Sequence, residues 1–156
     1  MLKIRSARAH CDIPCKIYDP LIIQVAAQSV ARLTDLLIDL DTVDSSLNNR
    51  GQFVRLVTEK ETQASKVKDE TRIIWGDYFK DPQLEAFPQT HDIVHNIMLT
   101  ASKCKQEISK ENATSLVEKV NEFSAIFWQT KGIKTRTVIA PYPPSLPMVV
   151  PMLKDA

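Results

Sequence analysis

The stretch that decides the fold of this 156-residue chain is ATSLVEKVNEFSAIFW, residues 113–128. Its apolar side chains recur every three or four positions, which is the period of an amphipathic helix and not the alternation of a strand. These positions are Ala113, Leu116, Val117, Val120, Phe123, Ile126, Phe127 and Trp128. A helix with one apolar face has to pack that face against other elements.

Three further stretches have a helical period. The first follows Pro20, a residue suited to the first turn of a helix, and its stripe is Ile22, Val25, Ala26, Ser29, Leu33, Leu36, Leu37 and Leu40. The second is expected from about Gln52 to Tyr78, with the thinner stripe Phe53, Leu56, Val57, Ala64, Val67, Ile74 and Tyr78. The third carries Ile93, Val94, Ile97, Met98, Ala101, Cys104 and Ile108.

The segments between these helices are short. Residues 41–51 are polar and rich in turn formers, so they are expected to form a loop. Pro82 and Pro88 interrupt the helical pattern, because each proline biases the preceding residue away from helix. Four amphipathic helices with short links predict an all-α fold, an antiparallel four-helix bundle. No alternating segment of strand length competes with them, except Thr135 to Ala140.

The composition changes after Gly132, which is expected to cap the last helix. Residues 133–156 hold five of the nine prolines of the chain and cannot form a helix. We expect an extended, polyproline-like arm that lies on a neighbouring surface or stays mobile. The alternative is a specific ligand for a proline-binding domain. The chain is thus divided into a leader (1–9), a helical domain (10–132) and an extended Pro-rich tail (133–156).

Charge and composition restrict the function classes. The formal net charge is +1, and removal of the leader with Lys3, Arg5 and Arg8 would leave −2, so neither form suggests nucleic acid as a partner. No run approaches the ~18 apolar residues that span a bilayer, so no membrane partner is expected. The leader lacks the apolar stretch of a secretory signal. We interpret it as a propeptide of a cytoplasmic protein; the alternative is an arm that stays attached.

The stretch HCDIPCKIYDP, residues 10–20, is called the hook here because its side chains suit a metal ion. Cys11 and Cys15 are four residues apart, and Pro14 restricts the turn between them, so both sulfurs can reach one ion. Thiolates favour soft or borderline metals. A cut after Ala9 would make His10 the N-terminus, which adds a free amine to its imidazole. The amine, the backbone amide nitrogen that follows His10 and the two sulfurs can form a square plane around a d⁸ ion, and the imidazole can serve as an axial fifth ligand.

Zinc is the alternative metal, but it requires four tetrahedral ligands and the hook alone leaves the set incomplete. His91 and His95 are four residues apart in the third helix and could complete it. That spacing is common by chance, and we expect both at surface or interface positions. The third cysteine, Cys104, falls in an apolar stripe and is expected to be a small core residue.

The hook resembles the nickel-hook motif of nickel-dependent superoxide dismutases, His-Cys-Asp-x-Pro-Cys-x-x-Tyr-Asp-Pro. All eight fixed positions are present: His10, Cys11, Asp12, Pro14, Cys15, Tyr18, Asp19 and Pro20. The resemblance continues in order and spacing over about residues 10–131. It includes residues 75–80 (WGDYFK), Phe87-Pro88, His91 and residues 126–131 (IFWQTK).

The resemblance implies a four-helix subunit in a homohexamer, whose propeptide is removed by a dedicated peptidase. It implies one nickel ion per subunit, held by the amine and imidazole of His10, the backbone nitrogen of Cys11 and the thiolates of Cys11 and Cys15. Its substrate would be superoxide, which Ni(II)/Ni(III) cycling converts to O₂ and H₂O₂. Tyr18 and Tyr78 would shape and gate the pocket, Pro14 would hold a cis peptide, and Asp12 would brace the hook.

Two positions depart from the family pattern. Members carry an acidic residue on the first helix that bonds the hook imidazole of another subunit, and an arginine on the second helix behind it. The matching positions here are Ala26 and Gln63. Because such partners orient a ligating imidazole, we consider Gln24, Gln28 or Glu61 as substitutes.

The leading hypothesis is a cytoplasmic nickel superoxide dismutase that becomes active after processing and metal loading. One alternative is a nickel or copper chaperone or sensor that uses the same hook without turnover. Another is a helical assembly protein in which Cys11 and Cys15 form a disulfide.

Overall fold

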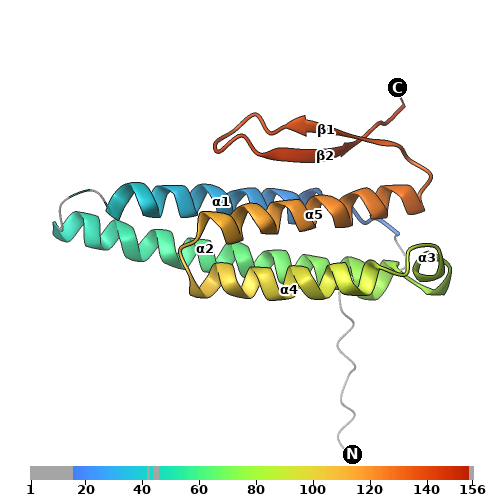
Figure 1. The fold of residues 1–156 in the computed structure, drawn as a ribbon, viewed down its shortest axis with the longest axis horizontal. Helices are drawn as coiled ribbons and strands as arrows, with labels where there is room; N and C mark the ends of the chain where they lie inside the picture. Colours follow the sequence, from blue (N-terminus) through green and yellow to red (C-terminus); the bar gives the residue numbers. More distant parts are fainter. Residues whose placement is uncertain (1–15, 42, 44–45, 155–156) are drawn as a thin grey trace, which may run out of the picture.

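Four long helices and a C-terminal β-hairpin make up most of the described chain (Figure 1). The structure is a computed structural model, which describes residues 16–41, 43 and 46–154. The elements are α1 (Leu21–Asp41), α2 (Leu47–Ile73) with a π-helical turn (Ile74–Tyr78), α3 (Asp81–Ala86), α4 (Thr90–Gln106), α5 (Lys110–Thr130), β1 (Thr135–Ile139) and β2 (Pro147–Pro151).

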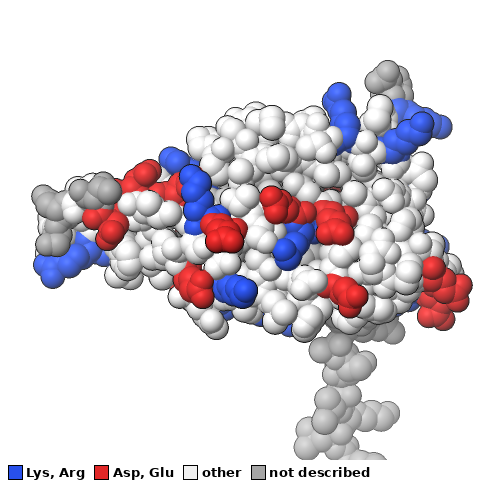
Figure 2. All heavy atoms as spheres, in the orientation of Figure 1, with Lys and Arg blue, Asp and Glu red and all other residues white. Residues whose placement is uncertain are grey.

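The four long helices form the predicted antiparallel bundle, with α1 and α5 in one layer and α2 and α4 in the other (Figure 1). Its centre contains Phe123 and Phe127 from α5, Ile97 from α4 and Val67 from α2, all with no exposed surface. Every apolar position predicted for residues 113–128 is buried. Burial of such side chains contributes about 1.5–3 kcal/mol each. Positive and negative side chains are interspersed over the visible face of the bundle (Figure 2).

Helix α1 is long and apolar enough to cross a membrane by length and composition alone, with half of that window buried inside the molecule. Its burial shows it as a core helix. The stripe predicted for it was partly wrong: Ile22 and Val25 are 47% and 46% exposed. The buried positions include Ile23, Ala27 and Val30. The error arose because two adjacent sets of positions in this helix have the same three-to-four spacing, and only packing selects between them.

The second helix begins earlier than predicted, at Leu47 instead of about Gln52. Its start is capped by Ser46, whose hydroxyl accepts a hydrogen bond of 3.2 Å from the backbone nitrogen of Asn49. The polar composition of residues 46–51 concealed this helical turn. The short helix α3 was also not predicted; Pro82 lies in its first turn, where the missing N–H costs nothing.

The end of α5 at Thr130 agrees with the predicted role of Gly132, which has φ +68°. The nitrogens of Gly132 and Ile133 donate to the carbonyls of Gln129 and Trp128, at 2.9 and 3.0 Å. This is the Schellman pattern, and glycine takes the left-handed conformation at no steric cost.

The tail is extended, as predicted, but it is a paired β-hairpin and not a polyproline-like arm. Strands β1 and β2 are antiparallel, with Thr137 opposite Val149. Met148 and Ala140 are buried, and β2 lies on the bundle layer of α1 and α5 (Figure 1). The alternating residues from Thr135 to Ala140 were the correct signal, and the prolines lie in the turn and at the ends of β2 instead of within β1.

Candidate metal centre

The predicted metal ligands His10, Cys11 and Cys15, with Asp12 and Pro14, lie outside the described residues, as do residues 1–9. The description begins at Lys16, where the chain enters the bundle. Asp19 Oδ1 accepts a hydrogen bond of 2.8 Å from the nitrogen of Leu21, and Pro20 is buried at the start of α1. The Asp19 side chain thus bonds the first residue of α1, and the carbonyl of Pro20 accepts from the nitrogen of Gln24, so the last two motif residues form the start of this helix.

Tyr18 and Tyr78 come together at this end of the bundle. Their ring centroids are 5.7 Å apart and the planes are tilted by 51°. Both rings are partly buried and pack on the core. Tyr78 is the last residue of the π-helical turn Ile74–Tyr78, a local widening that often occurs at functional sites. The structure therefore juxtaposes the two tyrosines that the sequence placed sixty positions apart.

The Tyr78 hydroxyl has a defined partner on α5. It lies 2.6 Å from Thr130 Oγ1, which itself lies 2.6 Å from the carbonyl oxygen of Phe127. Because a carbonyl can only accept, Thr130 donates to Phe127 and Tyr78 donates to Thr130. The phenol is thereby oriented by the last turn of α5.

A positive charge lies beside this tyrosine. The Lys131 ammonium is 4.7 Å from the Tyr78 ring centroid and 5.1 Å from that of Phe127, a cation–π arrangement. Neither Thr130 nor Lys131 was predicted to take part in the site. Both lie in the stretch 126–131 that carried the resemblance, and this was the available signal.

The two histidines of the third predicted helix do not form a metal site with each other. Both are exposed, as expected. His91 Nδ1 accepts a hydrogen bond of 3.1 Å from Trp75 Nε1, and the rings meet edge to face. In the described part of the chain, no group of three His, Cys, Asp or Glu side chains is arranged to hold a metal ion.

Cys104 is a core residue, as predicted, and 2% exposed. Burial raises the pKa of its thiol to about 11, a shift that the nearby Lys60 partly opposes. A buried thiol of this kind is chemically inert, and the described residues bring no group of three His, Cys, Asp or Glu side chains together around it.

The missing acidic and arginine residues, and the residues considered as their substitutes, differ in their burial and in the hydrogen bonds that their side chains already make. Ala26 is buried in the core, and Gln63 donates to Glu59 at 2.7 Å. The amide nitrogen of Gln24 bonds to Asn121 and to the carbonyl of Val149. Gln28 is 2% exposed and donates to the carbonyl of Pro147, yet its Oε1 has no partner. Of these candidates, Gln28 is thus the one with a buried acceptor that has no partner.

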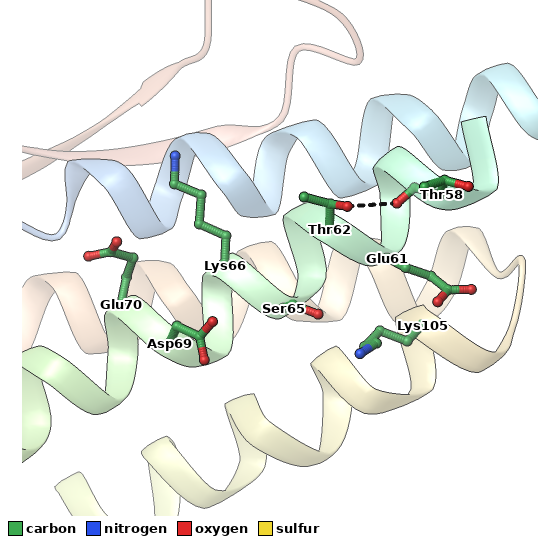
Figure 3. A pocket seen from close by; sticks show the side chains of 8 residues that line it. All are labelled: Thr58, Glu61, Thr62, Ser65, Lys66, Asp69, Glu70 and Lys105. Carbon is green, nitrogen blue, oxygen red and sulfur yellow. Dashed lines mark hydrogen bonds between the residues drawn. The ribbon is translucent and has the colours of Figure 1, made fainter. Parts of the chain in front are cut away.

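Gln28 also lines an apolar groove of about 450 Å³ between α1, α2 and the turn of the hairpin, with Glu59 and Gln63 in the same lining. Glu61 points elsewhere. It lines a polar groove of about 550 Å³ on α2, which also receives Lys105 from α4 (Figure 3). The structure therefore separates Glu61 from Gln28.

The donor chemistry of the chain fits nickel. Cys15 is three residues before Tyr18, so the connecting chain spans at most about 11 Å. The sequence of the hook carries two thiols and an imidazole, and this bound applies to Cys15. This mixed sulfur and nitrogen set suits a square-planar d⁸ ion.

Comparisons with known proteins agree with this chemistry. The family model described as nickel-containing superoxide dismutase matches residues 5–131. Superoxide dismutase [Ni] from Streptomyces seoulensis is 28% identical over 123 residues, and that from Streptomyces coelicolor is 29% identical. Each alignment covers 79% of this chain and 88% of the relative.

Solved structures extend the likeness to the fold. A crystal structure of Ni-containing superoxide dismutase in the oxidised ligation state superposes with a TM-score of 0.70 at 28% identity, covering 79% of this chain and 99% of the other. A native nickel superoxide dismutase structure gives 0.69 at 27% identity, covering 78% and 99%. The unmatched part of this chain includes the C-terminal hairpin, because the family match ends at residue 131.

Proposed function

We propose, on the premise that this chain belongs to the nickel-containing superoxide dismutase family, that its nickel is held by His10, Cys11 and Cys15. The chain is a superoxide dismutase with a nickel cofactor. The reaction converts two superoxide ions and two protons to O₂ and H₂O₂. Bound nickel supplies the Ni(II)/Ni(III) couple for this exchange. The chaperone or sensor alternative is not favoured.

The leader has to be removed for the full ligand set to form. Cleavage after Ala9 by a processing peptidase frees the amine of His10, so that the amine, the imidazole and the Cys11 amide nitrogen supply nitrogen donors from adjacent positions. The match to the hook motif over residues 10–20 supports this proposal. Cleavage also removes the three basic side chains of the leader.

The described residues support the reaction by shaping the approach to the hook. Tyr18 and Tyr78 restrict the opening with two packed rings, and the bond from Tyr78 to Thr130 holds one of the hydroxyls in place. The Lys131 ammonium adds a positive charge that attracts the superoxide anion. In this proposal, Pro14 forms a cis peptide that shapes the turn of the hook. Asp12 braces the same turn.

Assembly and location complete the proposed function. We expect a cytoplasmic homohexamer in which a second subunit supports the His10 imidazole. Gln28 is the favoured support in this chain, because its Oε1 has no partner and its side chain lines the groove between α1, α2 and the hairpin turn; Oε1 is buried, so the side chain has to turn toward the groove to meet a neighbour's imidazole. A glutamine oxygen accepts from an imidazole N–H, which orients the ring without adding a charge.

The deciding experiment compares protein that begins at His10 with protein that retains residues 1–9, each reconstituted with nickel. We expect rapid superoxide consumption and a rhombic Ni(III) EPR signal only for the form that begins at His10. Equal activity of both forms would exclude the amine as a required ligand. If the processed form binds nickel but does not turn over superoxide, the hook is a carrier.

Substitutions separate the metal ligands from the third cysteine. Cys11→Ser and Cys15→Ser should each abolish activity while the helical circular dichroism is retained. The Cys104→Ala variant, in contrast, should still bind nickel and consume superoxide. A loss of helical structure in the hook variants would instead indicate that these thiols are structural.

A further inference from the structure

The π-helical turn Ile74–Tyr78 is held from two sides, and one of these contacts has no role in the proposed function. At the last residue of the turn, the Tyr78 hydroxyl bonds Thr130 at the end of α5. Three residues earlier, Trp75 bonds His91 in the first turn of α4. The turn, the start of α4 and the end of α5 all lie at the end of the bundle beside α3 (Figure 1). His91 therefore bonds the segment that presents Tyr78.

The direction of Tyr78 depends on the width of this turn. The backbone nitrogen of Phe79 donates to the carbonyl of Ile74 at 3.3 Å, a bond across five residues instead of the four of an α-helix. Such turns are rare in proteins. If the turn relaxed to α geometry, the same nitrogen would bond the carbonyl of Trp75. The residues that follow would then rotate by one position, about 100° around the helix axis.

Two side chains of the turn bond two different helices. In an α-helix, residues three apart lie on the same face. Trp75 and Tyr78 are three apart, yet Trp75 Nε1 donates to His91 Nδ1 of α4 at 3.1 Å, whereas the Tyr78 hydroxyl bonds Thr130 of α5 at 2.6 Å. Each bond fixes one end of the turn to a separate part of the bundle, so together they oppose its relaxation.

The remaining contacts of the turn do not replace the bond to His91. Ile74 is buried in the core, and Lys80 Nζ donates to the carbonyl of Gly76 at 2.8 Å. A Cβ at Gly76 would meet no atom within 4 Å, so crowding at that position does not force the turn open. Trp75 is partly buried against the core, a setting in which an indole N–H usually finds an acceptor. His91 supplies this acceptor.

We propose that His91 is a positioning residue for Tyr78. Its Nδ1 holds Trp75 and thereby keeps the π-helical turn at the width that directs the Tyr78 hydroxyl to Thr130. The proposal rests on the proposed function in one respect, namely that Tyr78 shapes the approach to the hook. Because Nδ1 accepts, the neutral ring carries its proton on Nε2. In this role the histidine acts through the turn and not as a ligand of the metal.

Two substitutions separate the acceptor of His91 from its ring. His91→Asn places an amide oxygen near the position of Nδ1 and removes the ring. His91→Phe keeps a ring that can meet Trp75 edge to face, as the imidazole does, and removes the acceptor. His91 is exposed, so both variants are expected to fold. His95→Phe, also exposed and one turn further along α4, is the matched control.

Amide hydrogen exchange of the nickel-free protein reports on the turn itself. The readout is the amide of Phe79, whose bond to Ile74 closes the π-helical turn. We expect His91→Phe to speed its exchange about fivefold, because loss of one hydrogen bond makes the turn easier to open by roughly that factor. His91→Asn and His95→Phe should keep the wild-type rate. A wild-type rate in His91→Phe, or an equal increase in His91→Asn, would overturn the proposal.

Superoxide decay on the nickel-loaded protein tests the link to Tyr78. We expect His91→Phe to lower kcat/KM about threefold and His91→Asn to retain it. In the Tyr78→Phe background, His91→Phe should have no further effect on kcat/KM, because the hydroxyl that it positions is gone. An equal decrease in both backgrounds would indicate a purely structural role and refute the positioning of Tyr78.

The same variants distinguish this proposal from the proposed function. If Tyr78→Phe lowers kcat/KM and His91→Phe does not, the positioning role of His91 is wrong and the role of Tyr78 stands. If Tyr78→Phe alone leaves kcat/KM unchanged, the proposed role of Tyr78 is wrong, and the exchange of the Phe79 amide decides whether His91 holds the turn.

Discussion

Lys60 is the most unusual single residue of the bundle. It is 1% exposed, and its ammonium donates to the carbonyls of Cys104 and Glu107, the latter at 2.8 Å, where α4 ends. The terminal carbonyls of a helix have no partner within the helix, so a lysine of α2 satisfies those of α4. Burial lowers the pKa of Lys60 because it disfavours the charged form.

Lys60→Met should therefore destabilise the fold by about 2–3 kcal/mol, because it leaves buried carbonyls unpaired. Urea unfolding followed by circular dichroism measures this change. Lys66→Met, on an exposed position of the same helix, should change stability by less than about 0.5 kcal/mol. Equal effects of the two substitutions would mean that the buried bonds contribute nothing.

Cys104 gives a prediction on pH. Burial raises the pKa of its thiol from 9.0 to about 11 in the folded state. Between these values the unfolded thiol loses its proton while the folded thiol keeps it, so the stability of the fold decreases as pH rises from 9 to 11. Lys60, with its lowered pKa, contributes the opposite slope in an overlapping range. The difference between wild type and Cys104→Ala in urea unfolding at several pH values isolates the cysteine, and parallel curves would contradict this prediction.

Tyr78→Phe removes the hydroxyl that donates to Thr130 and retains the ring that packs on Tyr18. We expect a loss of about 1 kcal/mol in stability. If the same bond holds the hydroxyl for the reaction, kcat/KM decreases about fivefold, the rate equivalent of ~1 kcal/mol. Stopped-flow superoxide decay on the nickel-loaded variant measures it. Tyr142→Phe, a hydroxyl on the hairpin turn, should leave the rate unchanged.

At the level of elements, Asn121 connects the hairpin to the bundle. Its amide group bonds both Pro147 and Val149 of β2 and also Gln24 of α1. Asn121→Ala should loosen the hairpin, with residues 133–154 cleaved faster by limited proteolysis while the helical circular dichroism is unchanged. Asn96→Ala, on an exposed position of α4, is the control. Unaltered proteolysis in Asn121→Ala would show that Met148 and Ala140 hold the hairpin without the amide.

The helices were predictable from the sequence wherever one face is strongly apolar, as in α5. Local polar composition hid the start of α2, because the Ser46 cap and the turn after it resemble a loop. Packing alone decided which stripe of α1 is buried. The pair formed by Tyr18 and Tyr78 followed from the resemblance. Thr130 and Lys131 did not, because their roles depend on a contact between the π-helical turn and the end of α5 that no local pattern encodes.

At the level of the whole molecule, metal loading should couple to stability. A ligand that binds only the folded state at about a hundred times its Kd adds ~2.7 kcal/mol. Nickel should therefore raise the Tm of protein that begins at His10 more than that of protein that retains residues 1–9. Differential scanning calorimetry with equal nickel excess measures both, and Mg²⁺ serves as the control ion. Equal shifts for the two forms would indicate that the amine does not add to nickel affinity.

The Trp75–His91 contact gives the molecule an optical reporter close in sequence to Tyr78. The chain has two tryptophans: Trp128 is buried in the bundle at 8% exposure, whereas Trp75 lies three residues before Tyr78 and donates to His91. Their fluorescence is consequently separable, because a Trp75→Phe variant leaves only the emission of the core. Changes at the Trp75–His91 contact can therefore be followed as the difference in light emission between the native chain and this variant, with no attached dye.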